Sequence, residues 1–477
     1  MPPVIHSEEK PPTLPAAAPL PGVSPLVAGL LADLGIEAGA VETALDPADE
    51  MLEFLRRSER GDRDRALYTY FRSGASIAAG MLQVLRWRFG SLARVGRVLD
   101  FASGYGRVTR FLLRGLPAER VWVSDIYAGG VRFQERRLGV HGIVSTVLPE
   151  DFRGAAMSAG VAAGGGFDAV LVTSLFTHLS EERFVGWLQA LTGLLAPGGV
   201  LVFSVHDRSL LAPGVELPAS GLHFEAVSES GSLAGEDYGS AWVSERFVRD
   251  ALTRALAGTR WAGSLLRLPR GVCNFQDLYV AVPEADADFS ALQFRGDPHF
   301  FLERCTVDVA GAVAVDGAGD RLELRGWTGF KERGTAVAVE LVLDGRQLAR
   351  FAVEQRRPEV AEMLGDPRLT NAGWGGSCAL PAGAERTTSV LRLRVVDDLG
   401  GVHPMVAGTL EAVLHDSTRN DLAHASAELY ASRHRTAQLE HEAAGLRARI
   451  AAMEASRFWK LRNRWFRIKG WFGAGEG

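Results

Sequence analysis

The sequence predicts an α/β domain built on a parallel sheet, then an all-β sandwich, then a C-terminal coiled coil and amphipathic helix. The α/β domain follows from residues 98–282, where short apolar runs alternate with helical stretches. Runs that are apolar at every position suit strands buried on both faces. The sandwich follows from period-two alternation and hairpin turns in residues 306–414. The coiled coil follows from heptad spacing in residues 422–453.

Length and composition are those of a multidomain globular protein. The 477 residues are 47% hydrophobic, and about 150 residues per domain suggests roughly three units. Cys273, Cys305 and Cys378 are too few and too scattered for a disulfide framework or a zinc site, and no other metal-ligand spacing is present. With no signal peptide and no long apolar run, we expect a cytoplasmic protein. A net charge of −5 argues against general nucleic-acid binding.

Composition and periodicity divide the chain into six segments. Prolines crowd the first, which lacks the apolar residues that a core requires. A helical pattern then precedes the first strong strand. The expected segments are a leader at 1–25, a helical lead-in at 26–92, the α/β domain at 93–285, the β-sandwich at 300–415, the coiled coil at 418–455 and a tail at 456–477.

The elements of the α/β domain can be followed in order. The expected strands are residues 98–101, 121–124, 169–173 and 200–205. A helix should begin after Ser180, which can cap it, and stop at the Pro-Gly-Gly turn of residues 197–199. The carboxyl ends of parallel strands share one edge of the sheet, where ligands bind.

The first strand leads into a turn of small residues, since residues 100–107 are DFASGYGR. Small residues let a ligand approach the backbone, and the following helix offers unpaired N–H groups. Asp125 ends the next strand, about 20 residues on, where an acid can accept both ribose hydroxyls. A nicotinamide site would have a third glycine in place of Thr109, so the turn favours a smaller nucleoside ligand; a dinucleotide site and a plain tight turn are the alternatives.

These residues resemble class I S-adenosylmethionine-dependent methyltransferases, whose first motif is an acidic residue before a small-Gly-x-Gly turn. The resemblance covers about residues 68–282. Residues 167–179 are similar to the family's fourth strand and the loop after it, and residues 194–201 to its Pro-Gly-Gly turn. Ala102 stands where the family usually has its first glycine. The resemblance implies a Rossmann-like fold with S-adenosylmethionine as cofactor.

The resemblance also implies which residues hold that cofactor. The turn after the first strand would hold the methionine part, Asp125 the ribose and Ile126 one face of the adenine. An acid after the third strand would accept the exocyclic amine of the adenine. The expected cofactor-binding residues are Asp100, Ala102, Ser103, Gly104, Gly106, Arg107, Asp125, Ile126, Glu150, Asp151 and Thr173.

Two histidines follow strands at the ligand-binding edge of the sheet. Methyl transfer needs the acceptor in line with the methyl carbon, and it needs a base only when the acceptor holds its proton tightly. His178 and His206 follow the fourth and fifth strands of the family's sheet, so either could deprotonate a hydroxyl. A capping or packing role is the alternative for both.

Residues 221–246 interrupt the alternation of strands and helices, and they combine acidic with aromatic side chains. Such groups can hydrogen-bond to and stack on a polyhydroxylated substrate, which makes Glu225, Glu229 and Tyr238 the expected substrate-binding residues. A solvated surface loop is the alternative. In the helical lead-in, Tyr68, Tyr70, Ser73 and Gly74 could cover the cofactor, although such a Tyr-Phe cluster could simply pack.

Four motifs mark the β-rich segment: residues 324–327, 344–345, 357–360 and 371–374. They resemble an accessory domain of bacterial polysaccharide-synthesis proteins and glycosyltransferases. The resemblance implies a glycan setting, with glycosyltransferases as partners. If exposed, the tryptophans in two of these motifs, residues 327 and 374, could stack on a sugar ring; if buried, they would fill the sandwich core.

The C-terminal segments predict two interactions. The heptads of the coiled coil favour a homodimer, with a lone docked helix as the alternative. The tail has one apolar helix face with six basic and no acidic residues in 456–472, which is typical of a helix lying on an anionic membrane. It also resembles the C-terminal ends of bacterial surface-glycan glycosyltransferases. Docking on a partner protein is the competing interpretation.

Together these observations predict a methyltransferase that O-methylates a sugar hydroxyl of a cell-surface glycan or its precursor, at the inner face of the cell membrane. A lipid or small-metabolite hydroxyl is an alternative acceptor. A nicotinamide-dependent oxidoreductase or epimerase is disfavoured by the missing third glycine. A non-catalytic scaffold of a glycan-synthesis complex is the other alternative.

Overall fold

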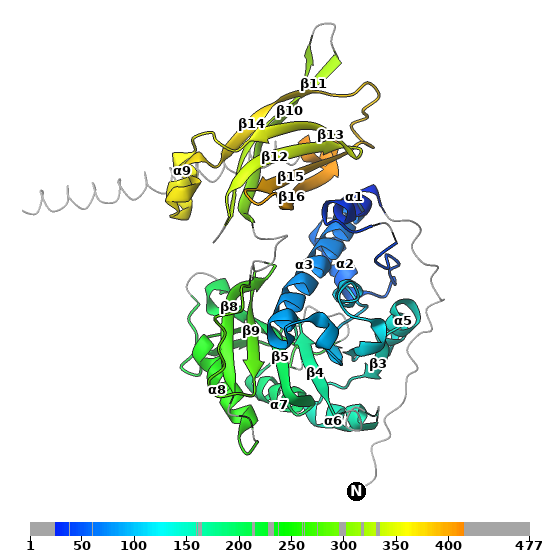
Figure 1. The fold of residues 1–477 in the computed structure, drawn as a ribbon, viewed down its shortest axis with the longest axis vertical. Helices are drawn as coiled ribbons and strands as arrows, with labels where there is room; N and C mark the ends of the chain where they lie inside the picture. Colours follow the sequence, from blue (N-terminus) through cyan, green and yellow to red (C-terminus); the bar gives the residue numbers. More distant parts are fainter. Residues whose placement is uncertain are drawn as a thin grey trace, which may run out of the picture.

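The structure, a computed structural model, describes most of residues 24–414 (Figure 1). The expected coiled coil, the tail and nearly all of the leader lie outside the described residues. None of the described helices combines the length and the apolar character needed to span a membrane. Gaps in the description fall at residues 38, 60, 159, 161–164, 212–214, 228–232, 237, 260, 262, 274, 295–301, 316–318 and 331–333.

A nine-stranded mixed sheet forms the centre of the α/β domain (Figure 1). Its order is β3-β2-β1-β4-β5-β7-β6, and β9 pairs antiparallel with both β5 and β8. The pairs from β3 to β5 are parallel, as the sequence predicts. The strands are β1 Val98–Phe101, β2 Val121–Asp125, β3 His141–Val144, β4 Phe167–Val172, β5 Leu195–Asp207, β6 Leu222–Glu225, β7 Ser240–Val243, β8 Ser264–Val272 and β9 Gln276–Val282. The strand order reverses between β1 and β4, and their carboxyl ends border the crevice where such sheets bind ligands.

Helices cover both faces of this sheet. Adjacent residues of β1 enter different apolar clusters: Val98 packs in one with α1 and α3, and Leu99 in the other with α6, α7 and α8. Burial on both faces explains why these strands are apolar throughout. The described helices are α1 Pro25–Asp33, α2 Glu50–Ser58, α3 Arg63–Phe89, α4 Thr109–Leu112, α5 Ala128–Leu138, α6 Pro149–Ser158, α7 Glu181–Thr192, α8 Glu245–Leu256 and α9 Pro358–Leu364.

The helix predicted to run from Ser180 to the Pro-Gly-Gly turn is shorter than expected. α7 begins after Ser180 and ends at Thr192, while β5 already starts at Leu195. Residues 197–199 therefore lie inside the strand rather than before it. Gly198 has a φ of 79°, and this left-handed backbone lets the strand bend where the sequence signals a stop.

Residues 302–409 contain two antiparallel sheets, which agrees with the all-β prediction. One has the order β10-β11-β14 and the other β13-β12-β15-β16. Leu324 on β11 and Leu341 on β12 belong to one apolar core between them. The predicted Asp344-Gly345 hairpin turn joins β12 to β13, with φ values of 47° and 83°. The strands are β10 Leu302–Val315, β11 Gly319–Phe330, β12 Ala336–Leu343, β13 Arg346–Ala352, β14 Gly373–Ala379, β15 Val390–Asp397 and β16 Val402–Thr409.

Both tryptophans of the sandwich motifs are buried. Trp327 is 4% exposed and packs with Val360 of α9, and Trp374 is 0% exposed in the core between the sheets. Neither ring can therefore stack on a sugar, and the packing interpretation is correct.

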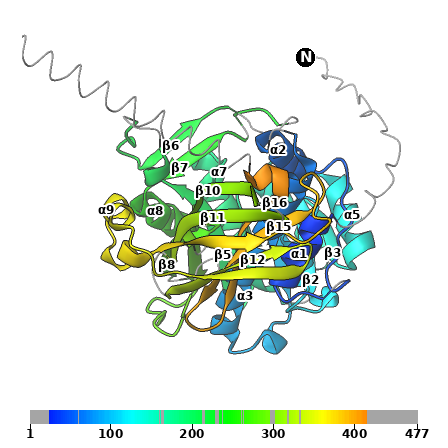
Figure 2. The ribbon, with the colours of Figure 1, turned by 90° about the horizontal axis from the view of Figure 1, so that it is seen from above.

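The first helix of the described chain lies between the two domains. In Figures 1 and 2, α1 sits beneath β15 and β16, and it also packs on α3. The Asp33 carboxylate, whose side chain is 4% exposed, forms ion pairs with Arg392 and Arg394 of β15. Arg72 of α3 donates to the Pro404 carbonyl of β16 at 3.1 Å. The helical lead-in thus precedes the sheet in the chain and also forms a joint between the two domains.

Candidate active site

The turn after β1 runs through left-handed backbone. The φ angle is 56° at Ala102, 57° at Gly104 and 80° at Gly106. Glycine adopts this conformation freely, whereas alanine pays about 1–2 kcal/mol. A side chain at Gly106 would also place its Cβ 2.8 Å from Gln134 Oε1. The turn brings Ala102, Ser103 and Gly104 into the lining of a cavity at the carboxyl edge of the sheet.

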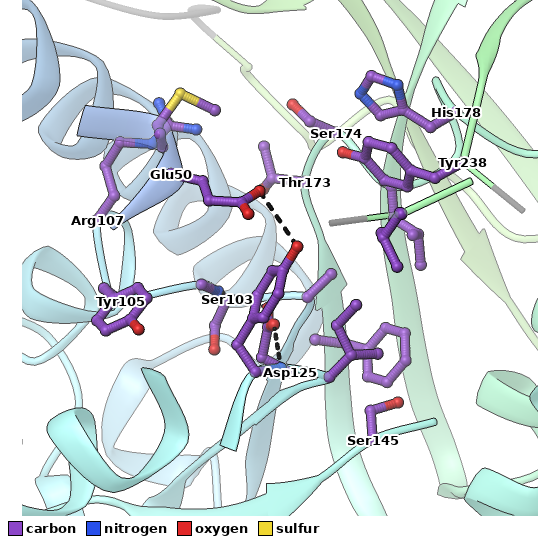
Figure 3. A pocket seen from close by; sticks show the side chains of 18 of the residues that line it. Glu50, Ser103, Tyr105, Arg107, Asp125, Ser145, Thr173, Ser174, His178 and Tyr238 are labelled. Carbon is purple, nitrogen blue, oxygen red and sulfur yellow. Dashed lines mark hydrogen bonds between the residues drawn. The ribbon is translucent and has the colours of Figure 1, made fainter. Parts of the chain in front are cut away.

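Asp125 ends β2 beside this turn and lines the same cavity (Figure 3). The Gly104 N–H donates to its Oδ2 at 2.8 Å, and the Tyr127 N–H donates to its Oδ1 at 3.0 Å. Burial raises the pKa of Asp125 above its usual range, while these backbone N–H groups oppose the rise. The carboxylate is thus fixed in orientation, and each oxygen keeps further acceptor capacity for a ligand hydroxyl.

Asp100 lies behind the turn and is not among the cavity-lining residues. It is 3% exposed and accepts a hydrogen bond from Thr109 Oγ1 at 2.7 Å. Burial raises its pKa to about 7, which the Thr109 hydrogen bond opposes. The hydroxyl of Thr109 also lies 2.8 Å from Gln134 Oε1. Thr109, which stands where a nicotinamide site would have its third glycine, thus links Asp100 of β1 to Gln134 of α5.

The segment before α3 covers the cavity from the other side. Glu50 Oε2 accepts a hydrogen bond from Tyr127 Oη at 3.1 Å, drawn as the dashed line beside Glu50 in Figure 3. The Tyr70 hydroxyl donates to Asp49 Oδ2 at 2.7 Å, which fixes the start of α2. Residues of this cover that line the cavity are Asp49, Glu50, Met51 and Phe54, and Tyr70 of α3 lines it beside them.

One buried arginine joins the cover to the turn. Arg110 is 1% exposed, and its Nη1 donates to the carbonyls of Glu42 at 2.8 Å and Ala44 at 3.1 Å. Its Nε donates to the Gly106 carbonyl at 2.9 Å. Because a guanidinium presents donors in a rigid fork, a single side chain sets the distance between residues 42–44 and the turn.

Residues after β2 and β3 line the cavity beyond Asp125. They are Ile126, Tyr127, Ser145, Thr146 and Val147. Glu150 and Asp151 lie elsewhere, on the exposed first turn of α6 and outside the lining. Acids at a helix N-terminus are stabilised there by the helix dipole, so their position has a structural cause.

His178 lines the opposite part of the cavity with Tyr238 (Figure 3). It is 7% exposed, and its ring stacks on Tyr238 with centroids 4.1 Å apart. Its Nδ1 lies 2.7 Å from the Gly239 carbonyl oxygen. Since a carbonyl only accepts, Nδ1 carries the proton of the neutral ring and Nε2 is the basic nitrogen.

The chain between β4 and His178 is held by a small polar network. Ser174 lines the cavity, and its backbone is left-handed with a φ of 62°. Its N–H donates to Ser204 Oγ at 2.8 Å. Gln276 Nε2 donates to Ser174 Oγ at 3.0 Å, and Gln276 Oε1 accepts from Ser204 Oγ at 2.7 Å. Thr173 also lines the cavity, and its Oγ1 is buried without a hydrogen-bond partner among the described residues.

The remaining predicted residues lie outside the cavity lining. His206 stands behind His178 with ring centroids 6.4 Å apart, and burial together with His178 lowers its pKa to about 4. Glu225 is exposed and lies 3.0 Å from His223 Nε2. Glu229 lies outside the described residues. Of the predicted bases, His178 is therefore the one at the cavity.

Comparison with known proteins identifies this region. Residues 98–199 match the family described as "Methyltransferase domain". The chain carries an S-adenosylmethionine-dependent methyltransferase domain. A malonyl-[acyl-carrier protein] O-methyltransferase of Prosthecochloris aestuarii is 27% identical over 146 residues, which are 31% of this chain. The chain spans about half the length of that relative, 52%.

Two solved structures illustrate the similarity of the methyltransferase domain to other proteins. DesVI of Streptomyces venezuelae is 17% identical, with a TM-score of 0.33 and coverage of 50% of this chain and 99% of its own. CalS10 of Micromonospora echinaspora, an amino pentose methyltransferase, is 18% identical, with a TM-score of 0.29. The match covers 43% of this chain and 90% of CalS10.

The side chains of the methyltransferase cavity fit S-adenosylmethionine by their chemistry. Asp125 offers a fixed carboxylate to a ribose diol, and Ile126 offers an apolar surface to a purine. Arg107, in the lining with its Nη1 2.8 Å from Ser73 Oγ, offers a cation to a carboxylate. The Thr173 hydroxyl, which has no hydrogen-bond partner among the described residues, offers a further polar contact.

The cover of the methyltransferase cavity includes residues that the sequence motifs do not indicate. Asp49 to Phe54 lie in the helical lead-in, where the only local signal is the capping of α2 by the Asp49 side chain. That signal marks a helix start and carries no chemistry. No cluster of His, Cys, Asp and Glu able to hold a metal occurs within the described part of the chain.

Proposed function

We propose that this chain transfers a methyl group from S-adenosylmethionine to a sugar hydroxyl of a cell-surface glycan or glycan precursor. The observation that carries the proposal is a single cavity that has the glycine turn and Asp125 in one part of its wall and His178 in another. The first part suits the nucleoside, and the second contributes a histidine that can serve as a base.

Bound in this cavity, S-adenosylmethionine supplies an electrophilic methyl group. His178 would remove, through Nε2, the proton that the acceptor hydroxyl loses when it is methylated. The Gly239 carbonyl holds Nδ1–H and stabilises the positive charge that the ring gains. Tyr238 fixes the plane of the ring by stacking on it. The cover formed by α2 limits access of water to the reacting groups.

Two features support a hydroxyl acceptor on a glycan. A sugar hydroxyl holds its proton tightly, so its methylation benefits from a basic histidine. The Gly239 carbonyl holds the proton of His178 on Nδ1 and leaves Nε2 as the basic nitrogen. The flanking β-domain resembles modules of polysaccharide-synthesis proteins, which is an argument by association. A lipid or small-metabolite hydroxyl would use the same base, and acceptor screening separates these cases.

The test uses the full chain. Calorimetric titration should show binding of S-adenosylmethionine that Asp125→Ala weakens by about tenfold or more, since a ribose contact is worth on the order of 1.4 kcal/mol. Transfer of a tritiated methyl group to neutral sugars should then fall about 100-fold or more in His178→Ala, with cofactor affinity retained. His141→Ala, at an exposed histidine on β3, is the matched control.

Each outcome has a distinct meaning. Binding without transfer to any sugar, but with transfer to lipid or metabolite hydroxyls, would replace the acceptor class. A folded chain that binds no S-adenosylmethionine and captures a glycosyltransferase would support the scaffold alternative.

The proposed place of action is the inner face of the cell membrane, with residues 456–477 on anionic lipid and 418–455 forming a homodimer. Deleting 456–477 should abolish sedimentation with phosphatidylglycerol vesicles and leave methyl transfer intact. Deleting 418–477 should in addition convert the dimer to a monomer in analytical ultracentrifugation. A chain that lacks the tail and still sediments with the vesicles would refute the membrane role.

A further inference from the structure

Three aromatic side chains stand in register across neighbouring strands beside the active site. His206 on β5 pairs with Trp242 on β7, and Trp242 pairs with His223 on β6. Paired residues point to the same face of a sheet, so the three rings form a row. Their centroids are 6.0 Å apart for His206 and Trp242, and 5.7 Å apart for Trp242 and His223.

The row extends at both ends. Phe275, just before β9, lies 5.4 Å from His206 between ring centroids and is 50% exposed. At the other end, Glu225 Oε1 lies 3.0 Å from His223 Nε2. We call Phe275, His206, Trp242 and His223 the aromatic strip. The strip begins next to the proposed base, because His206 is also the neighbour of His178 at 6.4 Å.

Core packing does not explain the strip. Trp242 and Phe275 are absent from both apolar clusters that fill the methyltransferase domain, and all four rings are at least partly exposed. Imidazole and indole rings have a flat face and a polar edge, and Glu225 adds a carboxylate beside them. Flat faces with a few polar groups are typical of sites that bind ligands carrying both C–H surfaces and hydroxyls.

The charge of the strip favours an uncharged ligand. His206, the second ring of the strip, is neutral at pH 7 because burial lowers its pKa to about 4. Glu225 at the outer end would repel a phosphate, and binding of single-stranded nucleic acid would call for a cationic groove. A lipid chain would be better matched by aliphatic side chains without polar edges.

We infer that the aromatic strip is a subsite for the sugar residues next to the one that is methylated, so that the acceptor is a chain of sugars rather than a monosaccharide. The inference rests on the proposed function, and it places the growing or finished polymer along β5, β7 and β6. His178 and Tyr238 would act on one sugar while the strip holds its neighbours.

The experiment compares methyl glycosides with linear tetrasaccharides of the same sugars, using tritiated S-adenosylmethionine and the full chain. The tetrasaccharide should have a kcat/KM about tenfold or more above that of its methyl glycoside. Trp242→Leu should remove this difference and leave both the rate with the methyl glycoside and the affinity for S-adenosylmethionine unchanged. His223→Ala should reduce the difference in the same direction.

Trp122→Leu is the matched control, because Trp122 is a cross-strand neighbour of His141 at the far end of the same sheet, with ring centroids 4.7 Å apart. It should retain the preference for the tetrasaccharide. Equal transfer to both acceptors, or a preference that survives Trp242→Leu and His223→Ala, would overturn the subsite while leaving sugar methylation intact. Binding of S-adenosylmethionine with no transfer to any sugar would instead overturn the proposed function.

Discussion

The cofactor part and the acceptor part of the cavity are built in different ways. At the cofactor part, residues 100–107 and Asp125 form one strand-turn-helix unit with the neighbouring strand, and two main-chain N–H groups hold the Asp125 carboxylate. At the acceptor part, Ser174 and His178 depend on residues as distant in sequence as Gln276 and Gly239. A local motif can therefore specify where the nucleoside binds, whereas the acceptor site depends on how four strands meet.

The largest effect of a single substitution should come from breaking the cofactor part. Arg110→Met leaves several buried carbonyls without their donor, so we expect a loss of about 3 kcal/mol in the free energy of unfolding. Affinity for S-adenosylmethionine should fall with it, because the cover loses its link to the turn. Denaturant titration and calorimetry measure the two effects. The exposed Arg114→Met is the control, and unchanged cofactor affinity in Arg110→Met would show that the cover is held by other contacts.

The second prediction concerns pH and the same region. Asp100 has a pKa of about 7 when folded and about 4 when unfolded, so between these values the folded state holds a proton that the unfolded state has lost. Stability should therefore fall as the pH rises from about 4 to 7, by up to roughly 1.4 kcal/mol per pH unit. Asp100→Asn should flatten this dependence in denaturant titrations across that range. A variant with the same slope as the wild type would contradict the assignment.

The third prediction sharpens the contrast at the acceptor part. Gln276→Ala removes the group that holds the Ser174 and Ser204 hydroxyls, so we expect kcat to fall about tenfold, equivalent to about 1.4 kcal/mol. Affinity for S-adenosylmethionine should not change, since the network lies away from the glycine turn. Steady-state kinetics with calorimetry separates the two quantities. An equal loss in cofactor affinity would mean that the two parts of the cavity are not independent.

The smallest expected effect is a gain in the stability of the domain. Ala102→Gly relieves left-handed backbone at φ 56° and should stabilise the domain by up to about 1 kcal/mol, after the entropic cost of glycine is subtracted. Cofactor affinity should be retained, because the backbone path of the turn is already that of glycine. Thermal unfolding gives the measurement. A lower melting temperature would indicate that the alanine methyl group makes a contact that outweighs the strain.

The sequence predicts the sheet because its strands are buried on both faces and leave a continuous apolar signal. It also predicts Asp125, since spacing alone places that residue at the end of the second strand. It does not predict Glu50 or Phe54, whose part in the site depends on how the lead-in folds back over the turn. The adenine contact expected of Glu150 stays a prediction. In the structure this residue lies exposed on the first turn of α6.

The position of α1 affects the order in which the protein can mature during synthesis. Asp33 is separated by 361 residues from Arg394, its ion-pair partner, so the ribosome releases the helix long before the strand on which it docks. Domains fold as they emerge, and contacts between distant residues form slowly. The sheet and the glycine turn can therefore assemble early, whereas α1 gains its ion pairs with Arg392 and Arg394 only after β15 has been made. The joint between the two domains is then completed after the methyltransferase sheet and not before it.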